Sequence, residues 1–445
     1  MRKRLALAAT AVLALLASLF VLAQPAHAQT GFTVEEGRLL DANGNDFVMR
    51  GVSHAHTWYA QETDSFAGIK SHGANTVRVV LSNGGQWTRN DASDVANVIS
   101  ICKANRLICM LEVHDTTGYG EAGAAVTLDE AVDYWISIQS VLSGEEDYIL
   151  INIGNEPYGN NASVNAGWAS ATSGAITRLR DAGFDHTLVV DAPNWGQDWA
   201  HIMRDNAPDV YAADPTGNTL FSIHMYGVYA QAATVTAYLE HFVDAGLPLV
   251  VGEFGHDHSD GNPDEDTIMA EAERLGLGYI GWSWSGNSGG VDYLDMTEGF
   301  DADNLTSWGE RIFYGSNGID ATAEEASVFG GSNPGPGPGP SPDPGGNTGC
   351  TAVYTTVGQW QGGFQGQVTV TAGAAALAGW QVKWTFGGGQ SVSQSWSTSL
   401  STSGAAVTAA NASYNGTLAA SGSTTFGFLG SGATPSSLAL TCTAL

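Results

Sequence analysis

Basic residues are scarce in this 445-residue chain, which has 16 Lys and Arg against 45 Asp and Glu and a formal net charge of −29 at pH 7. A surface of that sign repels nucleic acid and anionic lipid. We therefore expect no nucleic-acid partner and no membrane partner. The same charge suits a neutral substrate better than an anionic polymer.

Long apolar runs are also missing, except near the start of the chain. A basic beginning, an apolar stretch over 5–23 and an Ala-His-Ala site that ends at Ala28 follow one another there. This order is typical of a secretory signal peptide, so we predict that residues 1–28 are cleaved and that the mature protein is secreted and extracellular. A retained membrane anchor is the alternative, but no stop-transfer flank follows.

Cysteine is limited to four residues, Cys102, Cys109, Cys350 and Cys442. They form no Cys-x-x-Cys pair and no compact Cys/His spacing of the kind that holds zinc. An even number of cysteines in an exported chain favours disulfides instead. We predict a Cys350–Cys442 bond and a Cys102–Cys109 bond. The second pair has an alternative as two buried thiols at a helix end and a strand start.

Proline is sparse outside one stretch, residues 331–349, where it alternates with glycine. Such a composition builds neither a helix nor a strand ladder and acts as an extended spacer. It predicts two domains, residues 29–330 and residues 350–445, each long enough to bury a core. We expect the chain to act as a monomer.

The larger segment contains eight short runs rich in Val, Ile and Leu, separated by helix-like stretches. Eight such alternations over roughly 300 residues predict an α/β fold, the (β/α)8 TIM barrel. A doubly wound sheet is the alternative, but the Gly51–His54 segment is not the phosphate loop that it requires. The predicted strands are Phe47–Ser53, Thr76–Ser82, Leu107–His114, Tyr148–Asn155, Thr187–Asp191, Leu220–Met225, Pro248–Glu253 and Gly278–Ser285. Predicted helices include Ala92–Ala104, Leu128–Leu142, Ala162–Ala182 and Asp264–Leu275.

The smaller segment is rich in Thr, Ser, Gly and Val and lacks helical periodicity. Apolar and polar residues alternate in it, as in Gln367–Thr371. Short alternating strands with turn signals, and a disulfide between the two ends, predict an all-β antiparallel sandwich.

Two glutamates, Glu156 and Glu253, each end an apolar run in the larger segment. Desolvating a carboxylate costs free energy, and barrels gather their catalytic residues at the C-terminal ends of the strands. Two such acids on separate strands indicate a paired-carboxylate site that cleaves glycosidic bonds. The alternative is that one or both are salt-bridged structural acids.

Glycoside cleavage needs one protonated carboxyl and one ionised carboxylate. We expect Arg78 to lie near Glu253 and keep it ionised, and Tyr226 to donate a hydrogen bond to it. Asn155 offers an amide to a sugar hydroxyl, and Trp282 offers an aromatic floor. The remaining members of this set of strand-end residues are His114 and His224. Metal-dependent hydrolysis is the alternative use of such residues, but the sequence has no His-Glu-x-x-His motif, so we expect no catalytic metal and no required cofactor.

These residues, in this order and spacing, resemble glycoside hydrolase family 5. Four stretches resemble, more narrowly, the bacterial endo-β-1,4-mannanases of that family, and the resemblance runs from about Gly31 to Phe329. The stretches are Gly73–Gly84, Glu112–Tyr119, Gly252–His258 and Gly281–Gly290.

The resemblance implies a retaining double displacement, with Glu156 as general acid/base and Glu253 as nucleophile. It implies a plant mannan-type polysaccharide as substrate, cut at internal β-1,4 bonds of mannan, glucomannan or galactomannan. It also favours Trp282 over Trp284 as the floor of the sugar subsite. The alternatives are a family 5 cellulase and, in another class, a carbohydrate-binding protein on an inactive barrel.

The smaller segment resembles a family 2 carbohydrate-binding module. The stretches concerned are Trp360–Phe364, Gly379–Trp380, Gly389–Trp396 and Asn411–Gly416, between Cys350 and Cys442. The resemblance implies binding to insoluble cellulose or mannan through three exposed aromatic residues, Trp360, Trp396 and Tyr414. The third is usually Trp, and Tyr gives a smaller stacking face. Trp380 and Trp384 are expected in the core, and a fibronectin-like spacer without a ligand is the alternative.

The acidic run Asp257–Asp266 predicts a solvated acidic loop that ends at a helix N-terminus, where 264–266 would favour the helix dipole. A structural calcium is the alternative, because clustered loop oxygens bind hard cations. The run does not match the twelve-residue spacing of helix-loop-helix calcium sites.

Overall fold

A computed structural model describes residues 31–330 and 349–445, apart from residues 361, 374, 388, 413–414, 419–421, 436–437 and 439 and the side chains of 355 and 357–360. The chain divides into two compact units between Gly337 and Pro338, inside the predicted linker. Residues 1–28, predicted as a signal peptide, and 331–348 of the linker lie outside the described residues. Of the helices that the structure describes, none has the length and apolar character needed to cross a membrane.

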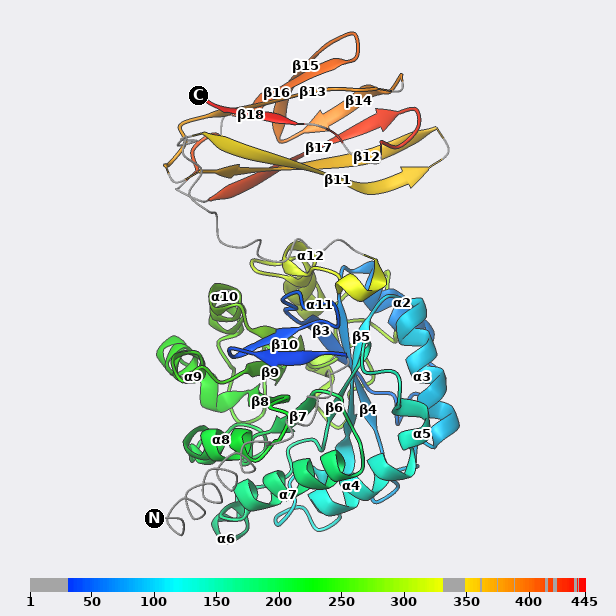
Figure 1. Ribbon diagram of the computed structural model, residues 1–445, viewed down its shortest axis with the longest axis vertical. Helices are drawn as coiled ribbons and strands as arrows, with labels where there is room; N and C mark the ends of the chain where they lie inside the picture. The colour runs from blue at the N-terminus through cyan, green and yellow to red at the C-terminus, as the bar shows by residue number, and fades with distance from the viewer. Residues whose placement is uncertain are drawn as a thin grey trace, which may run out of the picture. The chain divides into compact units, whose positions relative to one another are not determined.

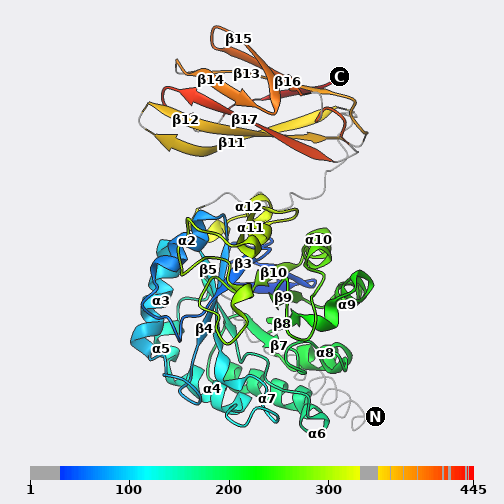
Figure 2. The same cartoon turned by 180° about the vertical axis from the view of Figure 1, so that it is seen from behind.

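Eight parallel strands of the first unit close into a barrel, and helices surround it (Figures 1 and 2). The strand order around the barrel is β10-β3-β4-β5-β6-β7-β8-β9. This confirms the predicted (β/α)8 fold. The strands are β3 (Arg50–His54), β4 (Thr76–Leu81), β5 (Ile108–Val113), β6 (Ile149–Asn152), β7 (Leu188–Asp191), β8 (Thr219–Met225), β9 (Leu249–Phe254) and β10 (Gly278–Gly281). The helices are α2 (Asp64–Ser71), α3 (Ala92–Ala104), α4 (Leu128–Ser137), α5 (Gln139–Leu142), α6 (Ala162–Asn165), α7 (Trp168–Asp181), α8 (Ile202–Ala212), α9 (Ala232–Asp244), α10 (Glu265–Leu275), α11 (Ser307–Tyr314) and α12 (Ile319–Thr322).

Several predicted boundaries were wrong. The strands expected over 148–155 and 278–285 end earlier, at Asn152 and Gly281, because the chain leaves the sheet there to form the mouth of the barrel. The helix expected over 128–142 is broken at Ile138, whose φ of −111° and ψ of 9° are not helical.

Successive side chains of a barrel strand point alternately outward and inward, so the barrel has an outer apolar core and an inner one. Cys109 and Leu111 of β5 belong to the cluster between barrel and helices, whereas Ile108 and Met110 belong to the apolar layer inside the lower barrel. The next residue of the inner row is Glu112, which is fully buried. Because a strand alternates its faces, the inner row changes from apolar to polar toward the C-terminal ends, which is where the barrel places its chemistry. The hairpin of β1 (Thr33–Glu35) and β2 (Arg38–Leu40) contributes Val34 and Leu39 to the inner apolar layer.

The second unit is a sandwich of two four-stranded antiparallel sheets, as predicted. Their orders are β11-β12-β17-β14 and β15-β16-β13-β18. Trp380 and Trp384 lie in the core between the sheets, which confirms that prediction. The strands are β11 (Cys350–Trp360), β12 (Gly363–Ala372), β13 (Trp380–Thr385), β14 (Ser391–Trp396), β15 (Thr398–Ser403), β16 (Ala406–Asn411), β17 (Ser423–Ser431) and β18 (Thr441–Ala444).

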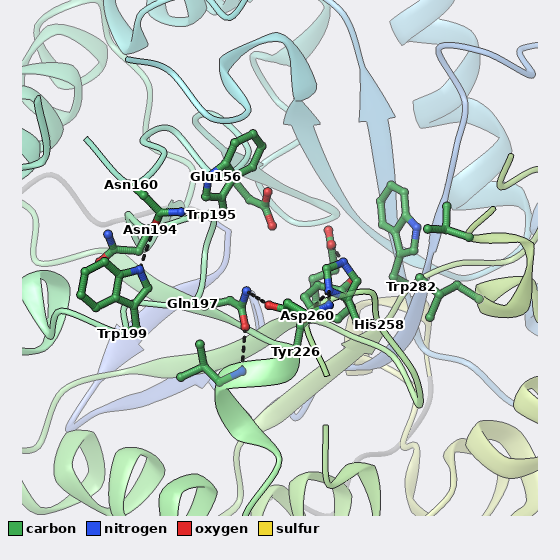
Figure 3. A pocket seen from close by; sticks show the side chains of 14 residues that line it. Glu156, Asn160, Asn194, Trp195, Gln197, Trp199, Tyr226, His258, Asp260 and Trp282 are labelled. Atoms are coloured by element: carbon green, nitrogen blue, oxygen red, sulfur yellow. Dashed lines mark hydrogen bonds and ion pairs between the residues drawn. The ribbon is translucent and has the colours of Figure 1, made fainter. Parts of the chain in front are cut away.

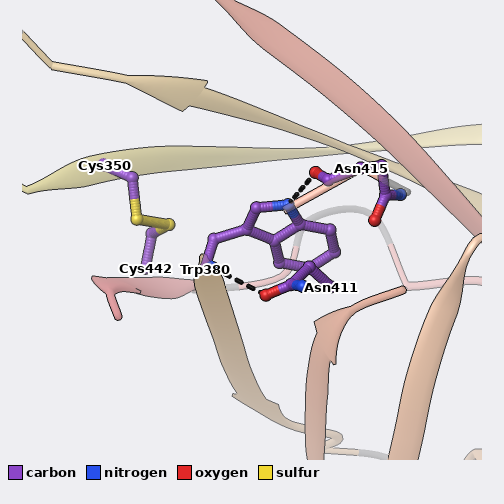
Figure 4. The surroundings of a disulfide bond; sticks show 5 residues. All are labelled: Cys350, Trp380, Asn411, Asn415 and Cys442. Carbon is purple, nitrogen blue, oxygen red and sulfur yellow. Dashed lines mark hydrogen bonds between the residues drawn. A yellow bond between two sulfur atoms is a disulfide. The ribbon is translucent and has the colours of Figure 1, made fainter. Parts of the chain in front are cut away.

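Both predicted disulfides are formed. Cys350 of β11 bonds Cys442 of β18, so the bond joins one strand of each sheet (Figure 4). Cys102 near the end of α3 bonds Cys109 at the start of β5, with Cα atoms 6.3 Å apart. The alternative of two buried thiols is therefore wrong.

Candidate active site

A β-bulge places Glu253 at the mouth of the barrel. The register between β8 and β9 shifts by one residue at Gly252, immediately before Glu253. A side chain at Gly252 would meet the Oγ atom of Ser222 at 2.1 Å, so any larger residue here would force Ser222 to move. Bulges of this kind turn the following side chain to a new direction. Glu253 consequently lines the cleft at the C-terminal end of the barrel.

Glu156 lies four residues beyond the end of β6, in a strained backbone conformation. Its φ of +40° falls in the left-handed region, which residues other than glycine rarely adopt. The surrounding structure holds this conformation: its N–H donates to Asp191 Oδ2 at 3.2 Å, and its carbonyl accepts from the N–H of Gly118 at 2.9 Å. Strain of this kind concentrates at functional sites, where neighbours compensate for it.

The carboxyl groups of Glu156 and Glu253 lie close together. One oxygen of each and one ring nitrogen of His224 all lie within 4.8 Å of one another. Carboxyl groups about 5–5.5 Å apart are typical of retaining glycosidases, whereas inverting enzymes leave about 6.5–9.5 Å for a water. The separation therefore fits direct attack by one carboxylate.

Glu253 has the two partners that its sequence context predicted. Arg78 Nη1 donates to its Oε2 at 3.0 Å, and the Tyr226 hydroxyl donates to its Oε1 at 2.7 Å. Burial raises the pKa of Glu253 above its usual value, while the positive charges of His224 and Arg78 and the hydrogen bond from Tyr226 oppose the rise. Both oxygens of this carboxylate are thus fixed in direction.

Arg78 is fully buried at the centre of the inner polar row. Its Nη2 donates to Asn155 Oδ1 at 2.6 Å and to Asn152 Oδ1 at 3.0 Å. Burial opposes its charge, but surrounding carboxylates prevail and raise the pKa of Arg78 further. In order of influence these carboxylates are Glu112, Asp191, Glu253 and Glu156. One cation is therefore shared among several acids.

Asn155 is 1% exposed, and its amide already has partners. Its Oδ1 accepts from Arg78, and its Nδ2 donates to Thr117 Oγ1 at 2.8 Å. In the described structure it holds the guanidinium in place. A contact between Asn155 and a sugar hydroxyl stays a prediction.

Asp191 is a member of the site that sequence reasoning missed. It ends β7, and its Oδ2 lies 3.2 Å from Nε2 of His224. Burial disfavours its charge, but His224 and Arg78 lower the pKa of Asp191 to about 2. Burial likewise opposes the imidazolium, but Glu253 and Asp191 raise the pKa of His224 to about 10. The position of Asp191 at the end of a predicted strand was the signal that could have revealed it.

His224 lies between the two glutamates. Its Nδ1 hydrogen bonds Glu156 Oε1 at 2.9 Å and lies 3.8 Å from Glu253 Oε2. With Glu156 and Glu253 it forms the one cluster of metal-ligand side chains found among the described residues. The Arg78 guanidinium contacts Glu253 and so places a positive charge beside this cluster. The geometry therefore fits two catalytic carboxyl groups whose cation is a protein side chain.

Trp282 lines the cleft, whereas Trp284 is completely buried. The indole N–H of Trp282 donates to Asn287 Oδ1 at 2.8 Å, which fixes the ring. Of the two tryptophans, only Trp282 is available to a sugar, as the sequence favoured.

A group of aromatic rings adjoins Trp282. The His114 ring stacks on Trp282 with centroids 5.8 Å apart and planes 19° apart. Trp58 and Trp87 lie against the same histidine at 5.2 Å and 5.5 Å. Burial opposes the charge of His114, but Glu112, whose carboxylate is 2.9 Å away, raises the pKa of His114.

A second aromatic group stands on the side of Glu156 (Figure 3). Trp195 donates its indole N–H to Glu121 Oε2 at 2.9 Å, and Trp199 donates to Asn160 Oδ1 at 2.8 Å. Trp199 is 54% exposed, although its N–H is held. Sequence reasoning missed both tryptophans because their loop after β7 carries no periodic pattern. Its backbone has left-handed φ values at Asn194, Trp195, Gly196, Asp198 and His201.

The cleft has a volume of about 360 Å³ and includes both glutamates. Trp195 and Trp199 line one part of it and Trp282 another, so Glu156 lies between aromatic surfaces (Figure 3). Apolar and aromatic faces with a few fixed polar groups are typical of ligand-binding sites.

The acidic residues after β9 make contacts with several different partners. Asp264 caps α10 by accepting from the N–H of Thr267 at 3.0 Å, which confirms the helix-start interpretation. Asp266 pairs with Arg311. The calcium expectation stays a prediction.

In the second unit, Trp396 is 40% exposed at the end of β14. Its ring covers Gly427 of the neighbouring β17, where a side chain would meet the indole at 2.3 Å. The absent side chain therefore lets the indole lie close to the sheet. Tyr414 and the side chain of Trp360 lie outside the described residues, so their exposure stays a prediction.

A (β/α)8 barrel that holds two carboxyl groups this close in an open, aromatic-lined cleft defines a glycoside hydrolase. The family model described as Cellulase (glycosyl hydrolase family 5) matches residues 40–288. The chain belongs to glycosyl hydrolase family 5. A second model, described as Cellulose binding domain, matches residues 350–444, so the enzyme carries a carbohydrate-binding module.

Named relatives resemble the chain over most of their length. A mannan endo-1,4-β-mannosidase from Streptomyces lividans is 57% identical over 345 residues, which cover 76% of this chain and 86% of that protein. The solved β-mannanase of Thermomonospora fusca is 74% identical, with a TM-score of 0.67, over 67% of this chain and 99% of that one. A mannohexaose complex of the latter enzyme is 73% identical, with a TM-score of 0.66 over the same shares.

Proposed function

We propose that this protein is an exported mannan endo-1,4-β-mannosidase that cleaves internal bonds of mannan, glucomannan or galactomannan with retention. The observation that carries the proposal is the combination of 74% identity to a solved β-mannanase with a Glu156–Glu253 pair whose oxygens approach within 4.8 Å. The leader-like segment 1–28 supports export.

The reaction takes two displacements. Glu253 attacks the anomeric carbon while Glu156 gives its proton to the leaving oxygen, which breaks the glycosidic bond and forms a glycosyl-enzyme ester. Glu156, now ionised, then takes a proton from water, and the resulting hydroxide equivalent displaces Glu253 from the sugar. Arg78 and Tyr226 fix both oxygens of the nucleophile, so little reorganisation is needed before attack.

The aromatic surfaces indicate how the polysaccharide chain is oriented in the cleft. The leaving portion of the chain must lie beside the acid, Glu156, which is where Trp195 and Trp199 stand. The sugar that is attacked lies over Glu253 and Trp282, and the group of aromatic rings that adjoins Trp282 lies on that side. Aromatic platforms on both sides of the scissile bond suit cleavage within a polymer.

The experiment that tests the proposal measures reducing ends from soluble mannan and from carboxymethylcellulose, with the first products analysed by proton NMR. We expect release from mannan, in internal cuts, and a β-anomer that appears before mutarotation. Faster release from carboxymethylcellulose would favour the cellulase alternative that the family description leaves open. An α-anomer among the first products would end the retaining mechanism.

We further propose that the module anchors the enzyme to insoluble cellulose or mannan, and that the enzyme acts as a monomer without a required cofactor. The exposed Trp396 and the match to a cellulose binding domain support the anchor. A structural calcium at the run 257–266 stays a prediction.

A variant that ends at Phe329 should keep its turnover on soluble mannan and lose its attachment to insoluble polysaccharide, because tethering raises local concentration without changing the site.

Trp396→Ala should weaken attachment by about 1–3 kcal/mol, if sugar stacking resembles other aromatic stacking. Val353→Ala, which trims an exposed side chain of the same sheet, is the matched control. Pull-down on cellulose and on insoluble mannan measures the attachment of the shortened enzyme and of both substituted variants. If the shortened enzyme sediments as fully as the whole chain, the module is not the anchor.

A further inference from the structure

Asp260, in the loop between β9 and α10, connects three loops on the nucleophile side of the cleft (Figure 3). Its Oδ1 accepts from the N–H of Gly227 at 3.1 Å and pairs with Nδ1 of His258. Its Oδ2 accepts from Gln197 Nε2 at 2.9 Å. Gly227 follows β8 and Gln197 follows β7, so one carboxylate fixes the chain beyond β7, β8 and β9.

The chain immediately after Tyr226 is held on two sides. A side chain at Gly227 would meet both the carbonyl oxygen and Oδ1 of Asp260 at 2.5 Å, so the acid packs directly on the backbone. On the other side, Gln197 Oε1 accepts from the N–H of Val228 at 3.2 Å. Because Gln197 also donates to Asp260, the two contacts form a closed bridge around this segment.

His258 extends the connection to the ring of Tyr226. The two ring centroids lie 4.5 Å apart, with planes at 33°. Asp260 holds His258 in that position through Nδ1. Tyr226 in turn donates its hydroxyl to Glu253 Oε1 at 2.7 Å. A continuous series of contacts therefore runs from Asp260 to the nucleophile.

We propose that Asp260 is a positioning residue, which orients Glu253 through Tyr226. The inference rests on the proposed function, since it gives Glu253 the role of nucleophile. Without Asp260, His258 and the Gly227 backbone lose their common acceptor, and the Tyr226 hydroxyl no longer holds its direction. A small misplacement of a reacting group slows a reaction strongly. The side chain of Asp260 is 40% exposed toward the cleft, so direct contact with the substrate is the competing explanation.

A double-mutant cycle separates these explanations. Asp260→Ala, Tyr226→Phe and the double variant are compared with the whole chain, by kcat and KM on soluble mannan and by thermal midpoint. We expect Asp260→Ala to lower kcat about 10-fold with KM changed less than about 2-fold, and to cost under about 2-fold once Tyr226 is already Phe. Asp260→Asn, which retains an acceptor for Gly227, should recover most of the lost kcat.

The matched control is Asp257→Ala, which removes a charge from the same loop and should leave kcat and KM unchanged. An equal loss from Asp260→Ala in both backgrounds would overturn the inference, because the acid would then act independently of Tyr226. A lowered thermal midpoint with unchanged kcat would overturn it too, as a purely structural role. The cycle is run on whichever of mannan and carboxymethylcellulose the native enzyme cleaves. An inactive native enzyme on mannan therefore counts against the proposed function alone.

Discussion

Glu253→Ala is expected to abolish hydrolysis of every substrate, with kcat reduced by at least about 10⁴-fold, because no other side chain can form the covalent intermediate. Glu156→Ala should behave differently. A substrate with an activated aryl leaving group needs little protonation to depart, so this variant should still form the glycosyl-enzyme from an aryl β-mannoside and release a burst of phenol. On mannan, whose leaving group is a poor one, the same variant should lose about 10²–10⁴-fold.

The measurement is a pre-steady-state burst of aryl release beside reducing-sugar release from mannan. Glu240→Ala is the control, since the side chain of Glu240 is 46% exposed and pairs only with Arg274 among its described ion-pair contacts. It should match the native enzyme on both substrates. If Glu156→Ala and Glu253→Ala lose equal activity on the aryl substrate, the two roles are wrongly divided.

Arg78→Met should destabilise the barrel by about 3–5 kcal/mol, the range measured when one partner of a buried ion pair is removed. The substitution keeps much of the volume but leaves Glu112, Asp191 and Glu253 without their shared cation. The carboxylates are buried, so they repel one another across a medium that screens poorly. Urea unfolding followed through the barrel transition gives the free-energy difference.

Arg178→Met is the matched control for that experiment. Arg178 pairs with Asp129 and Asp133 on the surface, where all three side chains are well exposed. Solvent-exposed ion pairs contribute between 0 and about 1 kcal/mol, so the control should shift the transition only slightly. Equal losses from the two variants would mean that the buried network does not depend on Arg78 for its stability.

The sequence determined the fold because the barrel repeats a local signal. The strands are short apolar runs and the longer helices are periodic, and both patterns can be read without knowing what they contact. The positions of Glu156 and Glu253 could be read in the same way, since a carboxylate that closes an apolar run is conspicuous in the sequence. The disulfide between Cys350 and Cys442 followed from composition and spacing at the ends of a segment.

The functional residues on the loops of the cleft could not be predicted in this way. Trp195, Trp199 and Asp260 stand in segments without periodicity, and nothing in their neighbours along the chain shows that they meet at one cleft. The strained turn at Glu156 was hidden too, because a left-handed φ at a residue other than glycine has no signature in the sequence.

By itself the sequence determined two domains, a (β/α)8 barrel followed by a β-sandwich, and the two glutamates that act together. The tertiary structure alone decided how those glutamates are held. Arg78 is shared among several acids, Asp191 pairs with His224, and Asp260 ties three loops behind Tyr226. The physical reason is that strands and helices form from interactions between near neighbours, whereas charge sharing depends on distances between residues of different strands and loops. Those distances exist only once the barrel has closed.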